Sequence, residues 1–343
     1  MTRRAMGRML MALIVAAMIA VPFVLPGEQW VNLVSLILIW ALFAIGFDLV
    51  FGVTGMLSFG HAALLGTGGY TMTVLMLSYQ VSFLPALAAA ALGGALLAFA
   101  MGLFALRVSG LFFALLTLAL AQMMYILASN KLRAITGGLD GIAGVPRPDL
   151  FGIDFYDNRN YYGFIVVVFL IGLAIMALLR ASPFGRALRA VQANDTRAAQ
   201  LGYNVHALRQ QAFVVSGAYA GVAGALLASL MFYISPQMLH WSTSGDVLIM
   251  TVLGGKGTLL GPILGVAVFE LLKEELSQVT QYWYGILGLI FILATIFLRN
   301  GIAGLFDGAR DRDEGARHDR GLAELREHPG VVRRAEGGQR RHS

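Results

Sequence analysis

The chain of 343 residues contains no cysteine and few charged side chains. Without cysteine it has no disulfide and no thiolate metal site. Charged residues make up 13% of the sequence, whereas 58% of the residues are hydrophobic and the mean hydropathy is +0.73. Soluble domains carry about twice that share of charge. This balance excludes an ordinary soluble enzyme and a disordered chain, and it predicts an integral membrane protein.

Catalytic motifs are also missing, because the sequence has no H-E-x-x-H, no G-x-S-x-G and no G-x-G-x-x-G between a strand and a helix. The run Gly254–Thr258 is similar to a phosphate-binding loop. However, Met250 stands where that loop needs glycine, and Gly257 stands where it needs serine or threonine. We therefore expect no catalytic residue, no metal site and no cofactor in this chain.

Arginine is distributed unevenly along the sequence. The net charge is +6, yet residues 299–343 hold ten arginines together with eight acids, and the arginines of the body stand beside apolar segments. This distribution favours membrane topology over nucleic-acid binding. We expect a transmembrane domain over residues 1–298 and a charged, disordered cytoplasmic tail over residues 299–343.

Apolar segments of the length that crosses a bilayer recur ten times, which predicts an all-α membrane protein with about ten transmembrane helices. The first segment is expected to be retained, because Pro22 and Pro26 lie at its end and a small-x-small cleavage site is missing. Glycine clusters at 66–69 and 254–257 predict that two segments are kinked or re-entrant. The ten segments are residues 9–25, 31–51, 60–78, 83–106, 111–129, 161–180, 208–234, 245–257, 259–276 and 284–298.

Positive charge is concentrated before the first segment, in residues 180–210 and in the tail. Cytoplasmic loops carry an excess of Lys and Arg, and even numbers of segments separate these three regions, so we expect both termini in the cytoplasm. Gly52–Leu57 and Gly221–Leu226 share the pattern G-V-x-G-x-L. With five segments in each half, this pattern suggests an inverted repeat.

Four polar residues within the apolar spans are candidates for a translocation path: Asp48, His61, Thr117 and Gln122. A charge at membrane depth is costly and is usually retained for function. The alternative is a structural role at the interface, which also suits Glu270 near the external end of its span. Asp246 has the position of a helix-start residue.

Small residues recur on one helical face at Gly217, Gly221, Gly224 and Ala228, and again at Gly261 and Gly265. Such stripes are typical of close helix packing in membranes.

Between two spans, Ser182 and Pro183 predict the start of a polar, basic helix over residues 184–201, and Gly202 with Asn204 predicts its end. From the residues alone, this helix is either a solvated connector or the element that receives force from an attached motor.

Several longer motifs appear in a fixed order over residues 45–305, and with them the chain resembles the LivM-type permeases of branched-chain amino acid ABC importers. They are Leu57–Ala63, Thr136–Gly141, Val145-Pro146, Ser182–Ala190, Ala198–Asn204 and Gly254–Pro262.

The resemblance implies that the chain is one subunit of a transport complex in the bacterial inner membrane. This complex would transport its substrate by alternating access. The partners of the chain would be a homologous second permease, two cytoplasmic ATPase subunits that bind ATP and Mg, and a periplasmic protein that delivers Leu, Ile or Val. The stretch 182–204 corresponds to the coupling helix, although its E-A-A-x-x-x-G core is altered. The implied ATPase-coupling residues are Ser182, Pro183, Phe184, Gly185, Arg186, Arg189, Ala198, Ala199 and Gly202.

Other functions stay open at this point. Related permeases serve urea, amides and other amino acids, and an ion-coupled carrier or channel would act alone. A membrane enzyme would use His61 and His240. No pair of opposite charges is evident at mid-membrane, so we expect a weakly binding passage, with selectivity supplied by the binding protein.

Overall fold

The computed structural model describes residues 27–150, 152–297 and 301–304. The expected first segment, 9–25, and all but a few residues of the expected tail lie outside the described residues.

The described residues are almost entirely helical. The long helices are α2 (Glu28–Asp48), α3 (His61–Tyr79), α4 (Phe83–Ala105), α5 (Leu111–Ile126), α7 (Asn158–Ala181), α10 (Val205–Met231), α11 (Trp241–Gly254), α12 (Gly261–Val279) and α13 (Trp283–Phe297). Shorter helical elements are η1 (Leu49–Val53), η2 (Leu127–Lys131), α6 (Arg133–Thr136), η3 (Gly138–Asp140), α8 (Pro183–Ala193), α9 (Asp195–Gln200) and η4 (Pro236–Leu239). The strands β1 (Ile142–Ala143) and β4 (Tyr233–Ile234) pair antiparallel, as do β2 (Asp149–Leu150) and β3 (Ile153–Asp154).

Each predicted segment from 31–51 onward coincides with one of the long helices. In the described part of the chain, five helical stretches are long and apolar enough to cross a membrane: Glu28–Val53, Phe83–Ala105, Leu111–Lys131, Asn158–Ala181 and Val205–Met231. The protein is therefore an all-α membrane protein. The expected count of ten transmembrane helices is not confirmed, because α3 is diluted by glycine and α11 is short.

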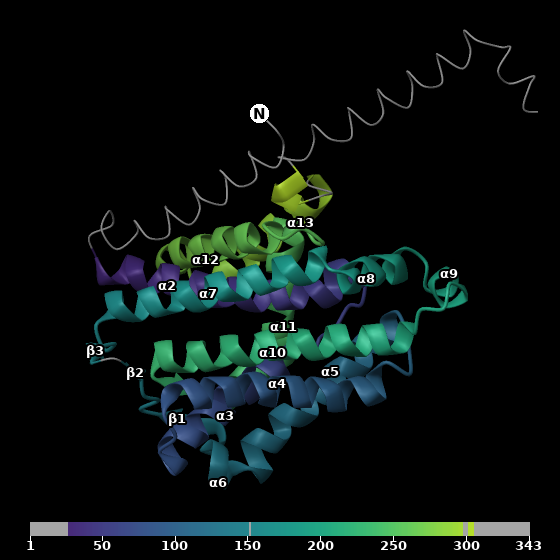
Figure 1. The fold of residues 1–343 in the computed structure, drawn as a ribbon. Helices are drawn as coiled ribbons and strands as arrows, with labels where there is room; N and C mark the ends of the chain where they lie inside the picture. Colours follow the sequence, from purple (N-terminus) through teal and green to yellow (C-terminus); the bar gives the residue numbers. More distant parts are fainter. Residues whose placement is uncertain (1–26, 151, 298–300, 305–343) are drawn as a thin grey trace, which may run out of the picture.

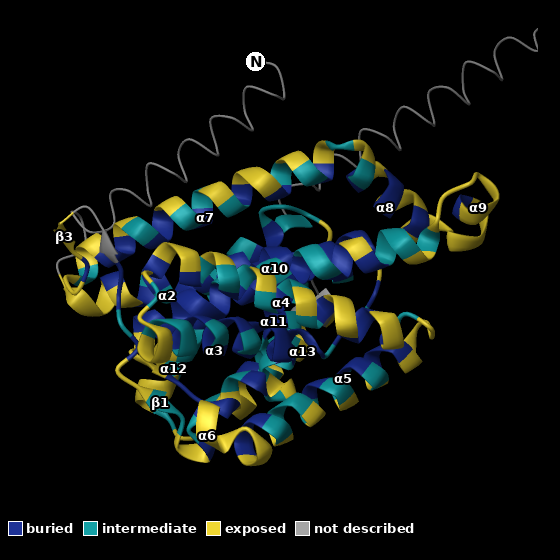
Figure 2. Cartoon of the chain, turned by 60° about the horizontal axis from the view of Figure 1, so that its bottom comes forward, coloured by how far each residue is buried: buried dark blue, intermediate teal, exposed yellow. Residues whose placement is uncertain are grey.

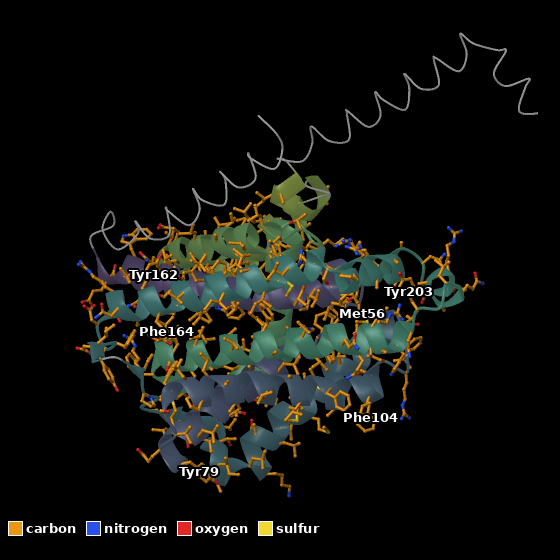
Figure 3. The ribbon with its side chains drawn as sticks, viewed as in Figure 1. Met56, Tyr79, Phe104, Tyr162, Phe164 and Tyr203 are labelled. Atoms are coloured by element: carbon orange, nitrogen blue, oxygen red, sulfur yellow. The ribbon has the colours of Figure 1, made fainter. Side chains whose placement is uncertain are left out.

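The helices form a bundle with α2 and α10 in its interior (Figures 1 and 2). Helix α12 and helix α7 pack on α2, while α3 and α4 pack on α10. We call the two ends of this bundle the α8 end and the strand end, after the elements found there. Aromatic side chains lie toward both ends, with Tyr79 and Tyr162 nearer the strand end and Phe104 and Tyr203 nearer the α8 end (Figure 3). Such belts are typical of the two membrane interfaces.

Helices α3 and α11 both begin inside the bundle. Residues 54–60 and 232–240 lead into these helices, and His61 and Ser244 in their first turns are fully buried. The kink expected inside 60–78 is wrong, because α3 is continuous through Gly66, Gly68 and Gly69. These glycines permit close packing instead. By contrast, α11 does end in the second glycine cluster, at Gly254.

The glycine stripe of α10 lies where neighbouring backbones approach most closely. A Cβ atom on Gly221 would clash with the carbonyl of Ala90 in α4, and one on Gly224 with the carbonyl of Leu65 in α3. Gly217 likewise faces Gly94 of α4. Because lipid is as apolar as leucine, this close backbone contact is a main source of helix association in a membrane.

The two copies of G-V-x-G-x-L do not occupy equivalent positions. Gly52 lies in the π turn η1 at the end of α2, whereas Gly221 lies in the middle of α10. The shared letters therefore do not mark the two halves of a repeat.

The packing of α10 leads to a first prediction. Gly221→Val should lower the free energy of unfolding by about 1–3 kcal/mol or more, because its side chain overpacks the contact with α4. Thermal unfolding of the purified protein in detergent measures this loss.

Gly163→Ala in α7 is the matched control, since a Cβ atom there meets no atom within 4 Å. An equal loss of stability in both variants would contradict the close-packing argument.

Candidate coupling site

A buried ion pair joins three elements at the α8 end of the bundle. Asp48 is the last residue of α2, and its Oδ2 atom accepts a hydrogen bond of 2.7 Å from Nη2 of Arg180, near the end of α7. Its other oxygen accepts from the backbone N–H of Gly257 at 2.8 Å. Asp48 is fully buried and Arg180 is 9% exposed. The charge-assisted bonds therefore hold α2, α7 and the loop between α11 and α12 together.

Helix α8 starts directly behind this ion pair. The Ser182 hydroxyl accepts from the N–H of Gly185, and Pro183 follows as the first helical residue, which is the usual N-terminal chemistry of a helix. A Cβ atom on Gly185 would lie 2.5 Å from the carbonyl oxygens of Leu179 and Arg180. Glycine thus lets α8 turn tightly against the end of α7.

The two faces of α8 differ in character. Leu188 and Val191 are buried against the bundle, and Phe184 packs partly against the same core. The opposite face carries Arg186 and Arg189, which are both exposed. This exposed basic face is the part of the helix that is free to meet another protein.

Polar contacts also fix α8 to the bundle. Arg189 donates from Nη1 to the carbonyl of Arg180 at 3.1 Å, and Arg186 donates to the carbonyl of Ala181 at 3.0 Å. Both arginines therefore cap the open carbonyls at the end of α7. Gln192 donates from Nε2 to the carbonyl of Gly52 in η1 at 2.8 Å.

The single helix expected over residues 184–201 is wrong, because two helices, α8 and α9, cover this stretch. Asn194 separates them with φ −165° and ψ 106°, and its side chain caps α9 by accepting from the N–H of Arg197. The helix stop near Gly202 is present, with a φ of 89° that favours glycine. Within α9, Ala198 is buried and Ala199 is exposed.

From η1, residues 54–60 connect the α8 end to the interior, where hydroxyl groups meet the start of α3. The N–H of Phe59 donates to Oγ1 of Thr117 in α5 at 3.1 Å, and the N–H of Ala62 donates to Oγ of Ser244 in α11 at 2.8 Å. His61 contacts Ser216 of α10, with 2.8 Å between Nε2 and Oγ. Side chains from three helices thus hold the first turn of α3 and the residues just before it.

The four path candidates lie in different surroundings. Asp48 belongs to the ion pair at the α8 end, and His61 is fully buried between the rings of Phe47 and Phe213. Thr117 is also fully buried and hydrogen-bonded. Gln122, on α5, is the partly exposed one of the four, and its Oε1 atom, like Nδ1 of His61, has no hydrogen-bond partner in the described residues. The structure therefore does not bring the four candidates into one site.

The expectation that no opposite charges pair at membrane depth is wrong. Glu270 lies in the middle of α12, not near its end, and its Oε2 atom is 3.2 Å from Nζ of Lys273. Asp246 lies near both residues but forms no ion pair within the described chain. It is also not a helix-start residue, because α11 begins at Trp241, capped by His240. Counting apolar residues does not reveal an ion pair between residues three positions apart on a helix. The spacing of Glu270 and Lys273 is nevertheless visible in the sequence.

Several residues that the sequence analysis did not single out contribute to these contacts. Ser216 is a single hydroxyl in an apolar span, Ser244 ends the run Ser242–Ser244 just before the segment 245–257, and Arg180 belongs to the positive charge that indicates topology. Within the described ranges, no group of three or more His, Cys, Asp or Glu residues is arranged to hold a metal ion. The geometry suits mechanical linkage between helices.

Residues 29–295 match the protein family described as branched-chain amino acid transport system, permease component. The chain is 29% identical to the high-affinity branched-chain amino acid transport system permease protein LivM of Escherichia coli (strain K12), over 85% of this chain and 74% of that protein. It is also 29% identical to the corresponding LivH protein of Salmonella typhimurium, over 81% of this chain and 95% of that protein. No solved structure matches this chain.

The contribution of the buried ion pair to stability can be tested by substitution. Asp48→Asn should lower the free energy of unfolding by about 3–5 kcal/mol, because Arg180 is left buried without a counter-charge. Thermal unfolding in detergent reports the loss, and Asp48→Leu combined with Arg180→Met should recover most of it.

The control is Asp195→Asn, which breaks a pair of Arg209 and Asp195 at 3.4 Å whose carboxylate is 53% exposed. This substitution should cost less than about 1 kcal/mol. Similar losses from both single substitutions would show that the buried Asp48–Arg180 pair contributes no more to stability than the exposed pair.

Proposed function

Because the chain belongs to the family of branched-chain amino acid transport system permease components, we propose that it is the membrane-spanning permease subunit of an ATP-driven importer. Its substrates are Leu, Ile and Val, handed over by a periplasmic binding protein. The permease performs no covalent chemistry. ATP and Mg are bound by two cytoplasmic ATPase subunits, and this chain receives the motion that they produce.

The observation that carries this proposal is the way in which α8 is anchored to the bundle. Its apolar face rests on the bundle through Leu188 and Val191, while its basic face is exposed. A solvated connector needs no such anchoring. A helix that transmits force needs one face to be fixed to the bundle and the other to be free for the motor.

The contacts of α8 indicate how its motion reaches the interior. A displacement of α8 pulls on Arg180 through Arg189 and on Gly52 through Gln192. The Asp48–Arg180 pair makes the ends of α2 and α7 move with it. Residues 54–60 then convey the movement to the hydroxyl contacts that hold the first turn of α3. Alternating access follows when this permease rocks against its partner.

We assign the α8 end to the cytoplasm, where an ATPase is found, and the strand end to the periplasm. With segment 9–25 as a further span, the chain has ten spans and both termini in the cytoplasm of a bacterial inner membrane. Helices α2 and α10 run in opposite directions, because the start of α2 and the end of α10 line the same cavity. Each is followed by a connection, 54–60 or 232–240, to a helix whose first turn is buried in the bundle. This supports an inverted repeat of five spans.

The second permease subunit is proposed to cover the face formed by α11 and α12. Asp246 and the partly exposed Lys273 lie on this face at membrane depth. Charged groups there are costly in contact with lipid and usually face protein or water. A homologous partner removes that contact.

A second candidate function, an ion-coupled carrier that acts alone, is favoured by one observation. Asp246 and Glu270 are two acids close together at membrane depth, as ion-coupled carriers often require. Transport into vesicles distinguishes the two functions. The importer needs ATP on the α8 side and the binding protein on the other, whereas the carrier needs only an ion gradient.

The exposed face of α8 yields a prediction about coupling. Arg186→Glu combined with Arg189→Glu should weaken association with the ATPase subunits by about tenfold and lower transport, because like charges then meet at the interface. Association is measured with the permease in lipid nanodiscs at low and high salt.

Arg107→Glu is the matched control. Arg107 is exposed at the same end of the bundle and donates to the carbonyl of Leu103 at 3.2 Å, as Arg186 does to Ala181. Normal association and transport by a correctly inserted double variant would count against the coupling role.

A further prediction concerns selectivity. The purified permease alone should not bind leucine, isoleucine or valine with a micromolar or tighter Kd, because the buried carboxylates Asp48 and Glu270 are already paired. Calorimetry on the detergent-solubilised chain measures this. A micromolar Kd would reveal a preformed site, and Gln122 would be the first residue to test by substitution.

A further inference from the structure

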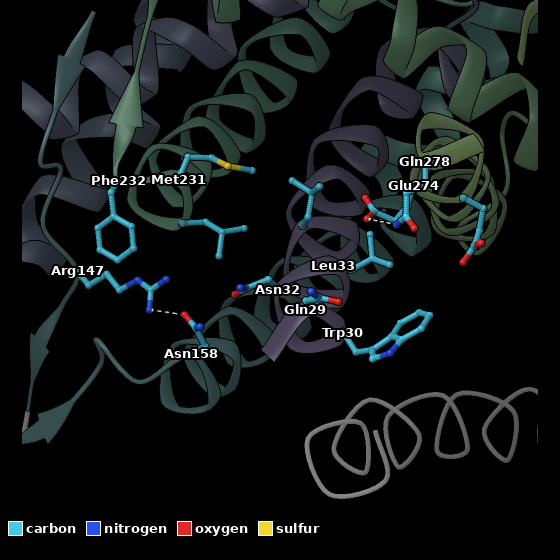
Figure 4. Close-up of a pocket in the computed structure, with 13 residues that line it drawn as sticks. Gln29, Trp30, Asn32, Leu33, Arg147, Asn158, Met231, Phe232, Glu274 and Gln278 are labelled. Carbon is cyan, nitrogen blue, oxygen red and sulfur yellow. Dashed lines mark hydrogen bonds between the residues drawn. The ribbon is translucent and has the colours of Figure 1, made fainter. Parts of the chain in front are cut away.

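A cavity of about 710 Å³ opens at the strand end, between the start of α2 and the ends of α10 and α12. Its walls carry both charged and apolar side chains (Figure 4). Arg147 and Asn158 lie on one side, and Glu274 lies on the other. Leu33 of α2 and Leu230 of α10 add an apolar lining. None of the contacts proposed for transport uses this cavity.

Arg147 is a buried cation with spare hydrogen-bonding capacity. It is 4% exposed, and its Nη1 atom donates to the carbonyls of Phe155 and Tyr156 and to Oδ1 of Asn158, at 3.0–3.1 Å. Burial lowers the pKa of this guanidinium, but an arginine side chain stays charged in a protein. Its Nε atom is buried without a hydrogen-bond partner among the described residues.

Aromatic rings hold the guanidinium in place. Its carbon atom lies 4.6 Å from the ring centre of Tyr161 and 4.4 Å from that of Phe232. No carboxylate in the described chain forms an ion pair with Arg147. Because an unmatched buried charge is costly, a fixed guanidinium beside a cavity is a ready partner for an anionic group.

The opposite wall has the opposite charge. Glu274 and Glu275, in the last turns of α12, line the cavity, and neither forms an ion pair in the described residues. Within the described residues, the carboxylate of Glu274 accepts one side-chain hydrogen bond, from Nε2 of Gln278 at 3.0 Å. The separated charges of the two walls match a molecule that carries an anionic group and an ammonium group.

A phospholipid headgroup suits this position better than a free amino acid. The cavity lies where α2 begins and α12 ends, and Trp30 lines it with 41% of its surface exposed. Tryptophan is enriched at the level of lipid headgroups. The apolar residues Leu33 and Leu36 continue from the cavity along α2 toward the middle of the bilayer, which suits an acyl chain. Basic pockets between transmembrane helices are known sites for lipid headgroups.

We propose that this cavity binds a phospholipid with a zwitterionic headgroup, with Arg147 holding the phosphate and Glu274 and Glu275 facing the ammonium group. The site is separate from the transport route and does not depend on the proposed substrates.

Native mass spectrometry of the full-length chain tests the proposal. The protein is released from nanodiscs that contain equal amounts of phosphatidylethanolamine and phosphatidylglycerol, and the retained lipids are counted. The wild type should retain phosphatidylethanolamine in preference. Arg147→Gln should weaken this retention about fivefold, whereas the exposed Arg159→Gln, outside the cavity, should leave it unchanged.

Glu274→Gln combined with Glu275→Gln changes only exposed side chains and therefore tests the site without a folding defect. This variant should lose the preference for phosphatidylethanolamine while it still retains phosphatidylglycerol. Retention and preference identical to the wild type in this variant and in Arg147→Gln would overturn the proposal. Displacement of the retained lipid by millimolar leucine would also overturn it, and would assign the cavity to amino acids.

Discussion

The ion pair of Asp48 and Arg180 is the contact on which the α8 end of the molecule depends. Removing two charges from water is costly, and hydrophobic residues of similar volume often stabilise a fold as well. A buried pair is therefore better explained by geometry than by stability alone. Its bonds at 2.7 and 2.8 Å fix the ends of α2 and α7 and the loop at Gly257 in one arrangement. Helix α8 starts at Pro183, three residues beyond Arg180, so its direction is set by this pair.

The interior helices are held together differently. Short hydroxyl side chains and close backbone contacts at glycine join them, instead of charged groups. Ser216 and Ser244 each contribute one oxygen to the first turn of α3, and Thr117 contributes one to Phe59 just before it. Gly221 and Gly224 let the backbones of α3, α4 and α10 come close enough for such short side chains to reach. Contacts of this kind are individually weak. An interior held in this way can shift when the α8 end moves, whereas a network of buried charges would resist it.

Much of the helix pattern is predictable from sequence, because apolar length and the chemistry of helix ends are local properties. Segment 83–106 and α4 nearly coincide, and Ser182-Pro183 marks the start of α8. Contacts between distant residues are different. Asp48 and Arg180 are 132 positions apart, and no local pattern indicates that they meet. The same limit explains the error at Gly66–Gly69: glycine in a span signals either a break or a close neighbour, and only the position of α10 decides between them. Asn194 is different, because its signal is local. Asparagine is a favoured N-cap residue, and at this position it indicates the start of α9 within the stretch 184–201 that is expected to form one helix.

The burial of His61 and Thr117 has a consequence for the route of transport. Both side chains are fully buried; the His61 contact ties α3 to α10, and the Thr117 hydrogen bond ties α5 to residues 54–60. A substrate that passed between these helices would have to break the contacts that define the first turn of α3. Gln122 on α5 and Asp246 on α11 are instead partly exposed polar residues. A passage along these outer faces needs a second wall, which the proposed homologous permease would supply. Under the proposed function, this chain would form one half of the passage, and movement of its interior helices would open that half.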